Sequence, residues 1–289
     1  MNEMPTLRTA LLDLLYELRD ADIKLIIGGG FGIYLRTQHV LETHQRTLLD
    51  VRPEARSTND LDLFLRPELL IHSTKLKPLA AAIDRLGYKV IPEAAKYQFV
   101  KPGPGGAAAG SLKLDLLTAP QSAFSGKGLK VDRRRVRPDP SIGIHAHPCD
   151  QVVTLEEKLL PVAFSGTLGS NKPWQAEIFL PHPYTLLLMK LFAFKDRIND
   201  PRKDLGRHHA LDLYSIIALM NEPEWQECRD FSHRLQNEPV IIEAGQIVTE
   251  HFSAVEQPGL LRLREHVYFR PEFQLPEFIS ALGELFRIA

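Results

Sequence analysis

The sequence has few cysteines, no long apolar run and no excess of charge of either sign. Its two cysteines, Cys149 and Cys228, are far apart and lack the spacing of metal ligands, which argues against a disulfide-built secreted domain. No run approaches the roughly 20 apolar residues of a membrane span, and the first residues lack the apolar core of a signal peptide. We therefore expect a cytoplasmic protein with two free thiols and no membrane partner.

The charges nearly balance over the whole chain. Thirty-five basic residues stand against 36 acidic ones, for a formal net charge of -1. Such a chain has no global field that attracts nucleic acid, so any nucleic-acid contact must come from a local patch. A length of 289 residues suffices for one large or two modest domains with a sizeable core.

The pattern of predicted elements changes near residue 181. Before it, strands such as 23–27 and 56–65 alternate with helices; after it, almost every segment has helical spacing. We therefore expect an α+β fold, with a mixed-sheet domain at 1–181 followed by a helical bundle at 182–289. Further expected elements are helices at 69–86, 155–160, 183–197 and 203–220 and strands at 96–101, 112–117 and 142–146.

The run Arg56-Ser57-Thr58-Asn59-Asp60-Leu61-Asp62-Leu63-Phe64-Leu65 places two carboxylates in a predicted strand. Because side chains alternate along a strand, Asp60 and Asp62 share one face. Carboxylate oxygens are the ligands that a hard cation such as Mg²⁺ takes, usually together with substrate phosphates. The pair predicts half of a metal and phosphate site; the alternative is an acidic, exposed strand edge.

Three glycines, Gly28, Gly29 and Gly30, follow a predicted strand and open a predicted helix. Such a turn lets backbone N–H groups approach a phosphate, and the helix N-terminus favours negative charge. The spacing matches neither the dinucleotide fingerprint nor the phosphate loop, and a merely tight turn is the alternative. A third carboxylate, Asp115, lies on the strand at 112–117. Its conjunction with the glycines and the Asp60 strand indicates a metal and nucleotide site.

Lys190 is the only charged side chain between Thr185 and Phe194, in a helix that is apolar all round. A buried ammonium needs a phosphate or carboxylate partner, unless its stem carries it out to solvent. Asp212, at the apolar edge of a downstream helix, is the partner that we favour. Arg197 shares the face of Lys190 and is expected to join the same phosphate site.

Together these motifs resemble the nucleotidyltransferase fold, in which a Gly-Gly or Gly-Ser turn, an Asp-x-Asp strand and a third strand carboxylate build a two-metal site. The match covers about the first 120 residues. More narrowly, the glycine turn, the run from Arg56 to Phe64 and the helical segments around Lys190 and Asp212 resemble the AbiE-type toxins and their MenT-like relatives. In that family a helical lysine and a downstream helical aspartate complete the site.

The resemblance implies a Mg²⁺- or Mn²⁺-dependent nucleotidyltransferase that moves a nucleoside monophosphate from a nucleoside triphosphate onto an acceptor hydroxyl. Asp60, Asp62 and Asp115 are the expected metal ligands, and Lys190 and Asp212 complete the expected catalytic set. The expected nucleotide-binding residues are Gly28, Gly29, Gly30, Ser57, Thr58, Lys190 and Arg197.

The resemblance also implies a toxin–antitoxin setting, with an RNA acceptor such as the 3′ end of tRNA and a cognate antitoxin as a partner. The helical domain is expected to complete the cleft for nucleotide and acceptor. Two alternatives stay open: an aminoglycoside-type, small-molecule nucleotidyltransferase with the same site, and a nucleotide-binding protein without turnover. The loop between Gly30 and Asp60 is longer than is usual in the family.

Two further motifs are less specific. The strongest local positive patch consists of Lys127, Lys130, Arg133, Arg134, Arg135 and Arg137. This run suits a nucleic-acid backbone or a triphosphate, but a solvated loop is the alternative because no aromatic residue is interleaved for base stacking. His145-x-His147-x-Cys149 carries metal-ligand types at alternating positions. Pro148 interrupts that strand and no fourth ligand follows, so we predict no metal there.

Overall fold

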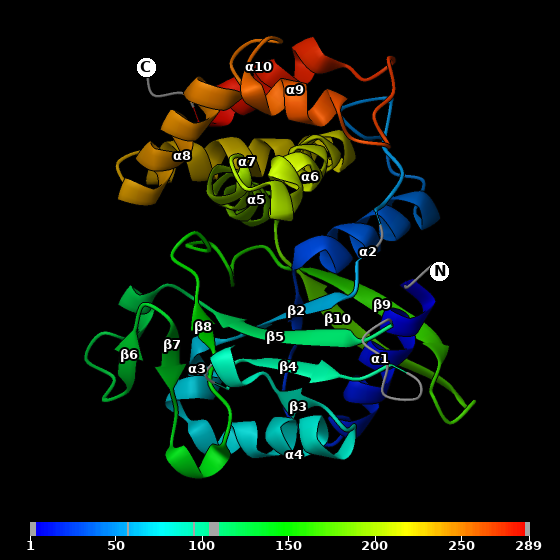
Figure 1. Ribbon diagram of the computed structural model, residues 1–289, viewed down its shortest axis with the longest axis vertical. Coiled ribbons are helices and arrows are strands. Elements are labelled where there is room, and N and C mark those ends of the chain that lie inside the picture. Colours follow the sequence, from blue (N-terminus) through cyan, green and yellow to red (C-terminus); the bar gives the residue numbers. More distant parts are fainter. Residues whose placement is uncertain (1–3, 57, 95, 104–109, 287–289) are drawn as a thin grey trace. The chain divides into compact units, whose positions relative to one another are not determined.

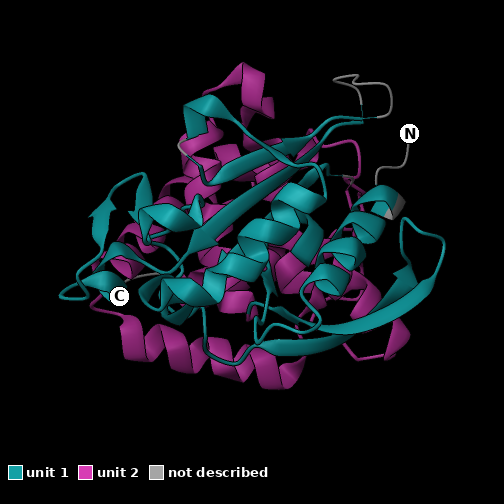
Figure 2. Ribbon diagram, turned by 90° about the horizontal axis from the view of Figure 1, so that it is seen from below, with its two compact units in different colours: residues 1–32, 57–181 teal, residues 33–56, 182–289 magenta. Residues whose placement is uncertain are grey.

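The computed structural model describes residues 4–56, 58–94, 96–103 and 110–286. The chain divides into two compact units, coloured separately in Figure 2: residues 1–32 with 57–181, here called the sheet unit, and residues 33–56 with 182–289, the helical unit. Residues 33–56, which the sequence assigned to the sheet domain, thus belong to the helical unit. Among the described residues no helix is both long and apolar enough to cross a membrane.

The sheet unit contains a mixed sheet of eight strands (Figure 1), in the order β3-β4-β5-β2-β1-β10-β9, with β8 also paired to β5. The β2–β5 pair is parallel, whereas β1–β2 and β4–β5 are antiparallel. A separate hairpin is formed by β6 and β7. The strands are β1 (Ile26–Ile27), β2 (Asp60–Leu65), β3 (Lys89–Val90), β4 (Gln98–Lys101), β5 (Leu112–Thr118), β6 (Lys130–Asp132), β7 (Arg135–Arg137), β8 (His147–Pro148), β9 (Leu160–Thr167) and β10 (Pro173–Leu180).

Strands β2 and β5 are neighbours in the middle of this sheet, and their leucines alternate with polar residues. Leu61 and Leu63 on β2 and Leu114 and Leu116 on β5 are fully buried. Burying each such side chain contributes roughly 2 kcal/mol, and this fixes which face of the strands turns inward. Helix α1 (Met4–Glu17) packs against β9 and β10. The polar face of β2 and β5 is left for the carboxylates.

Three expected elements of the sheet unit are wrong. The helix expected at 69–86 is divided into α3 (Pro67–Ile71), a 3-10 turn at Ser73–Leu76 and α4 (Lys77–Arg85). Pro78 has no N–H to donate to the preceding turn, so one α-helical ladder cannot run through it. The helix expected at 155–160 is absent: residues 155–156 lie in a turn, 157–158 form a bend and Leu160 begins β9. Residues 142–146 contribute a single bridge from Ala146 to Val136 instead of a strand.

The helical unit confirms the expected C-terminal bundle. It contains α5 (Pro183–Arg197), α6 (Arg207–Leu219), α7 (Glu222–Leu235), α8 (Pro239–His251), α9 (Pro258–Arg264) and α10 (Leu275–Phe286), and α2 (Gly29–Glu42) runs into it from the sheet unit. Helix α6 begins at Arg207, not at Lys203, because Asp204 and Leu205 have positive φ and end the preceding 3-10 segment. Asp204 is therefore not in the first turn of this helix.

The long segment between Gly30 and Asp60 is held along the helical unit by hydrogen bonds. The Leu48 N–H donates to the Met220 carbonyl at 2.8 Å, and the Asp50 N–H donates to Gln274 Oε1 at 2.7 Å. The Tyr214 hydroxyl donates to the Val51 carbonyl at 3.1 Å. Residues 33–56 of this segment are thus a part of the helical unit, and Arg56 lies at their end.

Candidate functional site

Three carboxylates lie on one face of the sheet. In the parallel β2–β5 ladder Asp62 is opposite Asp115, and Asp60 is opposite Lys113. Residues opposite each other in a parallel ladder point to the same face, and so do residues two apart on one strand. Asp60, Asp62, Asp115 and Lys113 therefore share the face that the central leucines do not use.

Two of these carboxylates have buried oxygens without a hydrogen bond. Asp115 Oδ2 accepts a hydrogen bond of 3.0 Å from Gln98 Nε2, which β4 places opposite it. Asp115 Oδ1 and Asp60 Oδ1 are buried and have no hydrogen-bond partner among the described residues. Lys113 Nζ lies 3.8 Å from Asp60 Oδ1, an ion-pair distance only. A buried carboxylate oxygen without a partner is costly, so these two atoms suit a cation.

The electrostatics of the face agree with this interpretation. Burial raises the pKa of Asp115, and the nearby Asp60 charge raises it further, whereas the hydrogen bond from Gln98 opposes the rise. Cys149 lies near the same face: burial, with the charge of Asp62, raises the pKa of its thiol to about 12. The thiol is therefore protonated at neutral pH.

Close packing against β2 explains two glycines of the turn. Gly29 has φ +62°, and a Cβ there would lie 1.6 Å from Asp62 Oδ2. A Cβ on Gly28 would lie 2.5 Å from the ring of Phe64. The Gly28 N–H also donates to the Asp62 carbonyl at 2.9 Å. The Asp62 carboxylate thus lies against the turn at the N-terminus of α2, where a helix favours negative charge.

Among the described residues, no three side chains of the His, Cys, Asp and Glu types are arranged to hold a metal ion. The donor chemistry nevertheless fits a hard cation, because the set is all carboxylate and two of its buried oxygens have no hydrogen bond.

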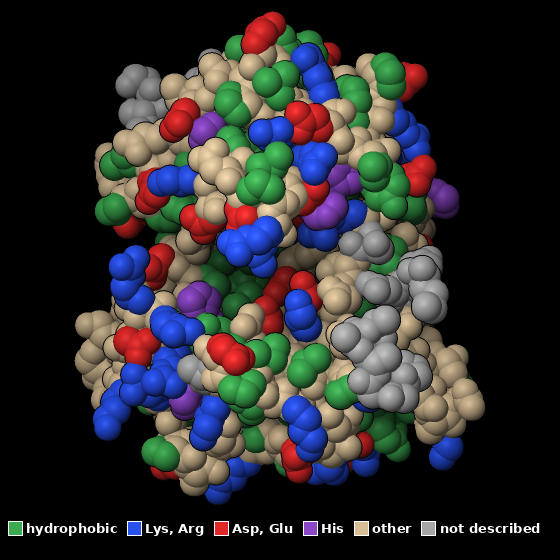
Figure 3. All heavy atoms as spheres, viewed as in Figure 1, with side chains coloured by type: hydrophobic (Ala, Val, Ile, Leu, Met, Phe, Trp, Pro, Cys, Tyr) green, Lys and Arg blue, Asp and Glu red, His purple; other side chains and the backbone are tan. Residues whose placement is uncertain are grey.

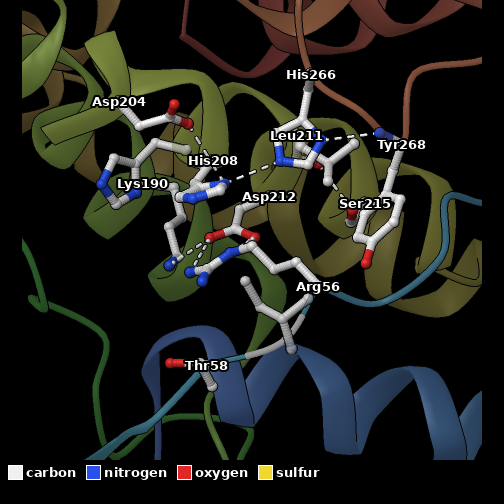
Figure 4. Close-up of polar contacts among 12 residues, drawn as sticks. Arg56, Thr58, Lys190, Asp204, His208, Leu211, Asp212, Ser215, His266 and Tyr268 are labelled. Atoms are coloured by element: carbon white, nitrogen blue, oxygen red, sulfur yellow. Dashed lines mark hydrogen bonds and ion pairs between the residues drawn. The ribbon is translucent and has the colours of Figure 1, made fainter. Parts of the chain in front are cut away.

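In the helical unit, two cations converge on Asp212 (Figure 4). Lys190 Nζ lies 2.7 Å from Asp212 Oδ2, and both side chains are buried. Arg56 donates from Nε to Oδ1 and from Nη2 to Oδ2, each at 3.0 Å. The expected Lys190–Asp212 pair is confirmed, and the alternative of a lysine that reaches solvent is wrong. Such a two-pronged arginine–carboxylate contact fixes geometry as well as charge.

The surroundings of Asp212 keep it ionised and the neighbouring histidine neutral. Burial alone would raise the pKa of Asp212, but the Lys190 and Arg56 charges outweigh burial and hold this pKa well below its usual range. Burial and the Lys190 charge lower the pKa of His209 well below its usual value. Arg197 hydrogen-bonds the Nε2 atom of His209. Arg197 therefore lies in the same cluster as Lys190, as its helix face predicted.

Two solved structures resemble this chain. The antibiotic-resistance factor ANT(2'')-Ia, a solution structure, has a TM-score of 0.39 and 15% identity, covering 82% of this chain and 97% of that one. The crystal structure of an antigenic nucleotidyltransferase-like protein from Paracoccidioides brasiliensis has a TM-score of 0.41 and 14% identity, covering 100% of this chain and 95% of that one. No family model and no curated protein matches.

The other expected site residues have structural contacts or lie outside the described residues. Thr58 Oγ1 accepts from the Asp60 N–H at 3.3 Å, so its hydroxyl orders the start of β2. Ser57 lies outside the described residues. Asp204 Oδ2 lies 3.5 Å from His208 Nδ1. Figure 4 shows His208 bound in turn to His266, with the two ring nitrogens 2.9 Å apart.

The sequence interpretation gave no role to Arg56. This residue stands four positions before Asp60, in the run that carried the resemblance, yet its partner Asp212 is 156 residues away. A basic residue just before an acidic strand was the available signal. The His145-x-His147-x-Cys149 motif, by contrast, is used structurally: His147 Nδ1 donates to the Arg134 carbonyl at 2.7 Å.

Proposed function

We propose that this protein is a metal-dependent nucleotidyltransferase that moves a nucleoside monophosphate from a nucleoside triphosphate onto a hydroxyl of RNA. The observation that carries the proposal is the β2–β5 register, which sets Asp62 beside Asp115 with Asp60 on the same face. The buried, unpartnered oxygens of Asp60 and Asp115 support it further.

Asp60, Asp62 and Asp115 are the residues that would hold Mg²⁺ or Mn²⁺. The bound ion supplies neutralisation of the triphosphate charge and orientation of the leaving group. In the reaction, the acceptor oxygen forms a bond to the α-phosphorus, and the bond from that phosphorus to the bridging oxygen breaks. Pyrophosphate leaves with the electron pair. Asp115 orients the acceptor hydroxyl and takes its proton.

The glycine turn is the proposed phosphate contact of the sheet unit. Gly29 and Gly30 open α2, so their N–H groups belong to the first turn, whose N–H groups have no partner within the helix. Gly28 holds the turn on β2 through its bond to the Asp62 carbonyl. A side chain at Gly29 would displace Asp62, which couples the turn to the carboxylate face.

Lys190 and Arg197 are the proposed phosphate contacts of the helical unit. Two cations, Lys190 and Arg56, both contact the carboxylate of Asp212. Arg197 adds a further cation beside the neutral His209. Asp212 is a positioning residue in this scheme, because it fixes Lys190. The toxin setting, the tRNA 3′ end and a cognate antitoxin remain proposals drawn from the family resemblance.

Label transfer tests the proposal. The purified protein is incubated with each α-³²P-labelled nucleoside triphosphate, Mg²⁺ and total RNA, and in parallel with an aminoglycoside instead of RNA. We expect label in RNA, and loss of at least about 100-fold in an Asp60→Asn, Asp62→Asn double variant, as for removal of charge-stabilising groups. Asp20→Asn, an exposed carboxylate, is the control and keeps full transfer.

Each other outcome overturns a stated part of the proposal. Unchanged transfer by the double variant removes the carboxylates from the chemistry. Label in the aminoglycoside and not in RNA replaces the acceptor by a small molecule. Nucleotide binding in calorimetry with no labelled acceptor of either kind makes the protein a nucleotide-binding protein without turnover.

A further inference from the structure

The basic residues of the β6–β7 hairpin form an exposed surface on the sheet unit. Between Lys127 and Arg137 there are six basic residues and one acidic residue, Asp132. Figure 3 shows Lys and Arg side chains gathered over this hairpin. Lys127, Lys130 and Arg133 are exposed and make no ion pair with a described residue. This concentration contrasts with the near-neutral charge of the whole chain.

Asp132 organises the hairpin turn instead of neutralising the surface. Its Oδ1 accepts the backbone N–H groups of Arg134 at 2.9 Å and Arg135 at 3.1 Å, and its carboxylate pairs with Arg135 and Arg137. The hydrogen bond from Arg137, with those two N–H groups, lowers the pKa of Asp132 to about 2. The turn is therefore fixed at neutral pH, and Lys127, Lys130 and Arg133 remain exposed.

The tertiary structure supplies the aromatic surface that the sequence run lacks. The rings of Tyr97 and His147 stack with centroids 5.2 Å apart and an interplanar angle of 29°, and both residues are partly exposed. His147 Nδ1 donates to the Arg134 carbonyl, which ties this stack to the hairpin. A partly exposed aromatic pair beside exposed cations is the combination that single-stranded nucleic acid uses, with bases stacking and phosphates paired.

This surface adjoins the carboxylate face through the sheet. His147 on β8 is opposite Leu117 of β5, two residues and about 7 Å along the strand from Asp115. The hairpin is joined to the same region by the Val136–Ala146 bridge, whose two hydrogen bonds are 2.8 and 3.2 Å long. The hairpin and the Tyr97–His147 stack therefore adjoin the part of the sheet that carries Asp115.

We infer that the β6–β7 hairpin and the Tyr97–His147 stack bind the RNA acceptor, with phosphates on the hairpin and an unstacked base on the rings. This inference rests on the proposed function for the identity of the acceptor. The favoured partner is RNA and not an acidic protein, because the exposed cations come with a stacking surface that a protein carboxylate does not need.

Binding without turnover tests the inference. Fluorescence anisotropy of a 5′-fluorescein tRNA and of a fluorescein single-stranded RNA is measured from roughly 50 to 200 mM salt. The variant is Lys127→Ala, Lys130→Ala, Arg133→Ala; its control, Lys24→Ala, Lys89→Ala, Lys172→Ala, removes the same charge from exposed positions of the same unit. We expect the hairpin variant to bind RNA about tenfold or more weakly, and its plot of log K against log salt concentration to be less steep by about 2. The control is expected to lose less than about twofold in affinity.

The stack has its own test. Tyr97→Ala is expected to weaken binding roughly tenfold with an unchanged salt slope, while Tyr97→Phe keeps wild-type affinity because it keeps the ring. Equal losses in the hairpin and control variants, or displacement of RNA by polyglutamate as readily as by unlabelled RNA, overturn the inference. Hairpin-dependent RNA binding without label transfer refutes only the proposed function. Label transfer to RNA that the hairpin variants leave unchanged refutes only this inference.

Discussion

Lys190 Nζ lies 2.7 Å from Asp212 Oδ2 inside the helical unit, with 6% of one side chain and 3% of the other exposed. Neither charge has enough water to stabilise it alone: Asp212 depends on Lys190 and Arg56, and the Lys190 charge depends on the carboxylate of Asp212. This triad is the reason that an apolar helix tolerates a lysine. Loss of the triad is therefore expected to lower the free energy of unfolding.

Removing one partner of this pair is expected to destabilise the protein strongly. Asp212→Asn removes the buried carboxylate that Lys190 and Arg56 share, which costs about 3 to 5 kcal/mol in the free energy of unfolding. Lys190→Met is expected to cost less, because Arg56 still pairs with Asp212. Urea denaturation measures this loss. Lys195→Met, which breaks an exposed pair with Glu243, is the control and is expected to cost at most about 1 kcal/mol. Equal costs at the two sites would contradict the triad.

Stability is expected to fall as the pH drops from 6.5 toward 4, in part through His182. This residue caps α5, with Nδ1 accepting the Tyr184 N–H at 3.2 Å. Burial lowers the pKa of His182 to about 4 from an ordinary 6.5. The unfolded chain therefore takes up the proton first, so the contribution is complete above pH 6.5 and is lost toward pH 4.

His182→Asn isolates this effect, because asparagine also caps a helix but does not titrate. We expect the free energy of unfolding to drop roughly 1 to 3 kcal/mol less in the variant than in the wild-type protein between pH 7 and pH 4. Guanidinium denaturation at both pH values checks it. The same drop in both proteins would show that His182 is already protonated when folded.

Gly29→Ala is expected to damage both the fold and the carboxylate face. Its Cβ would overlap Asp62 Oδ2, and a residue with a side chain is strained at a φ of +62°. The free energy of unfolding is therefore expected to fall by more than about 2 kcal/mol. Gly128→Ala is the matched control: its φ is +71°, but nothing lies within 4 Å of its Cβ. It is expected to cost about 1 kcal/mol in thermal or urea unfolding. Similar costs for the two would show that Asp62 moves away freely.

Divalent metal is expected to stabilise the folded protein. At a Mg²⁺ or Mn²⁺ concentration about 100 times the dissociation constant, binding to the folded state adds about 2.7 kcal/mol and raises the Tm by several degrees. Asp60→Asn and Asp115→Asn are expected to lose this rise, while Asp20→Asn keeps it. Scanning calorimetry with metal or with EDTA measures it. An equal rise in all four proteins would place the metal elsewhere.

The local features of the fold were predictable because they depend on neighbours in the chain. Alternation along residues 60–65 gave the strand and the shared face of its two carboxylates, and helical spacing gave α5 with its observed bounds. The errors arose where distant contacts overrode local pattern. Leu160, expected in a helix, pairs with Leu180 in β9–β10. The helix expected at 203–220 begins only at Arg207, after Asp204 with φ 58°.

The sequence by itself determined the chemistry that this protein carries: a glycine turn, three strand carboxylates and one lysine in an apolar helix. Only the tertiary structure decided which of these meet. The ladder register set Asp62 beside Asp115, a contact across 156 residues brought Arg56 to Asp212, and the Tyr97–His147 stack appeared beside a basic run that has no aromatic residue of its own. The reason is physical: spacing fixes the face on which a side chain lies, whereas its partner is fixed by the packing of leucines elsewhere in the core.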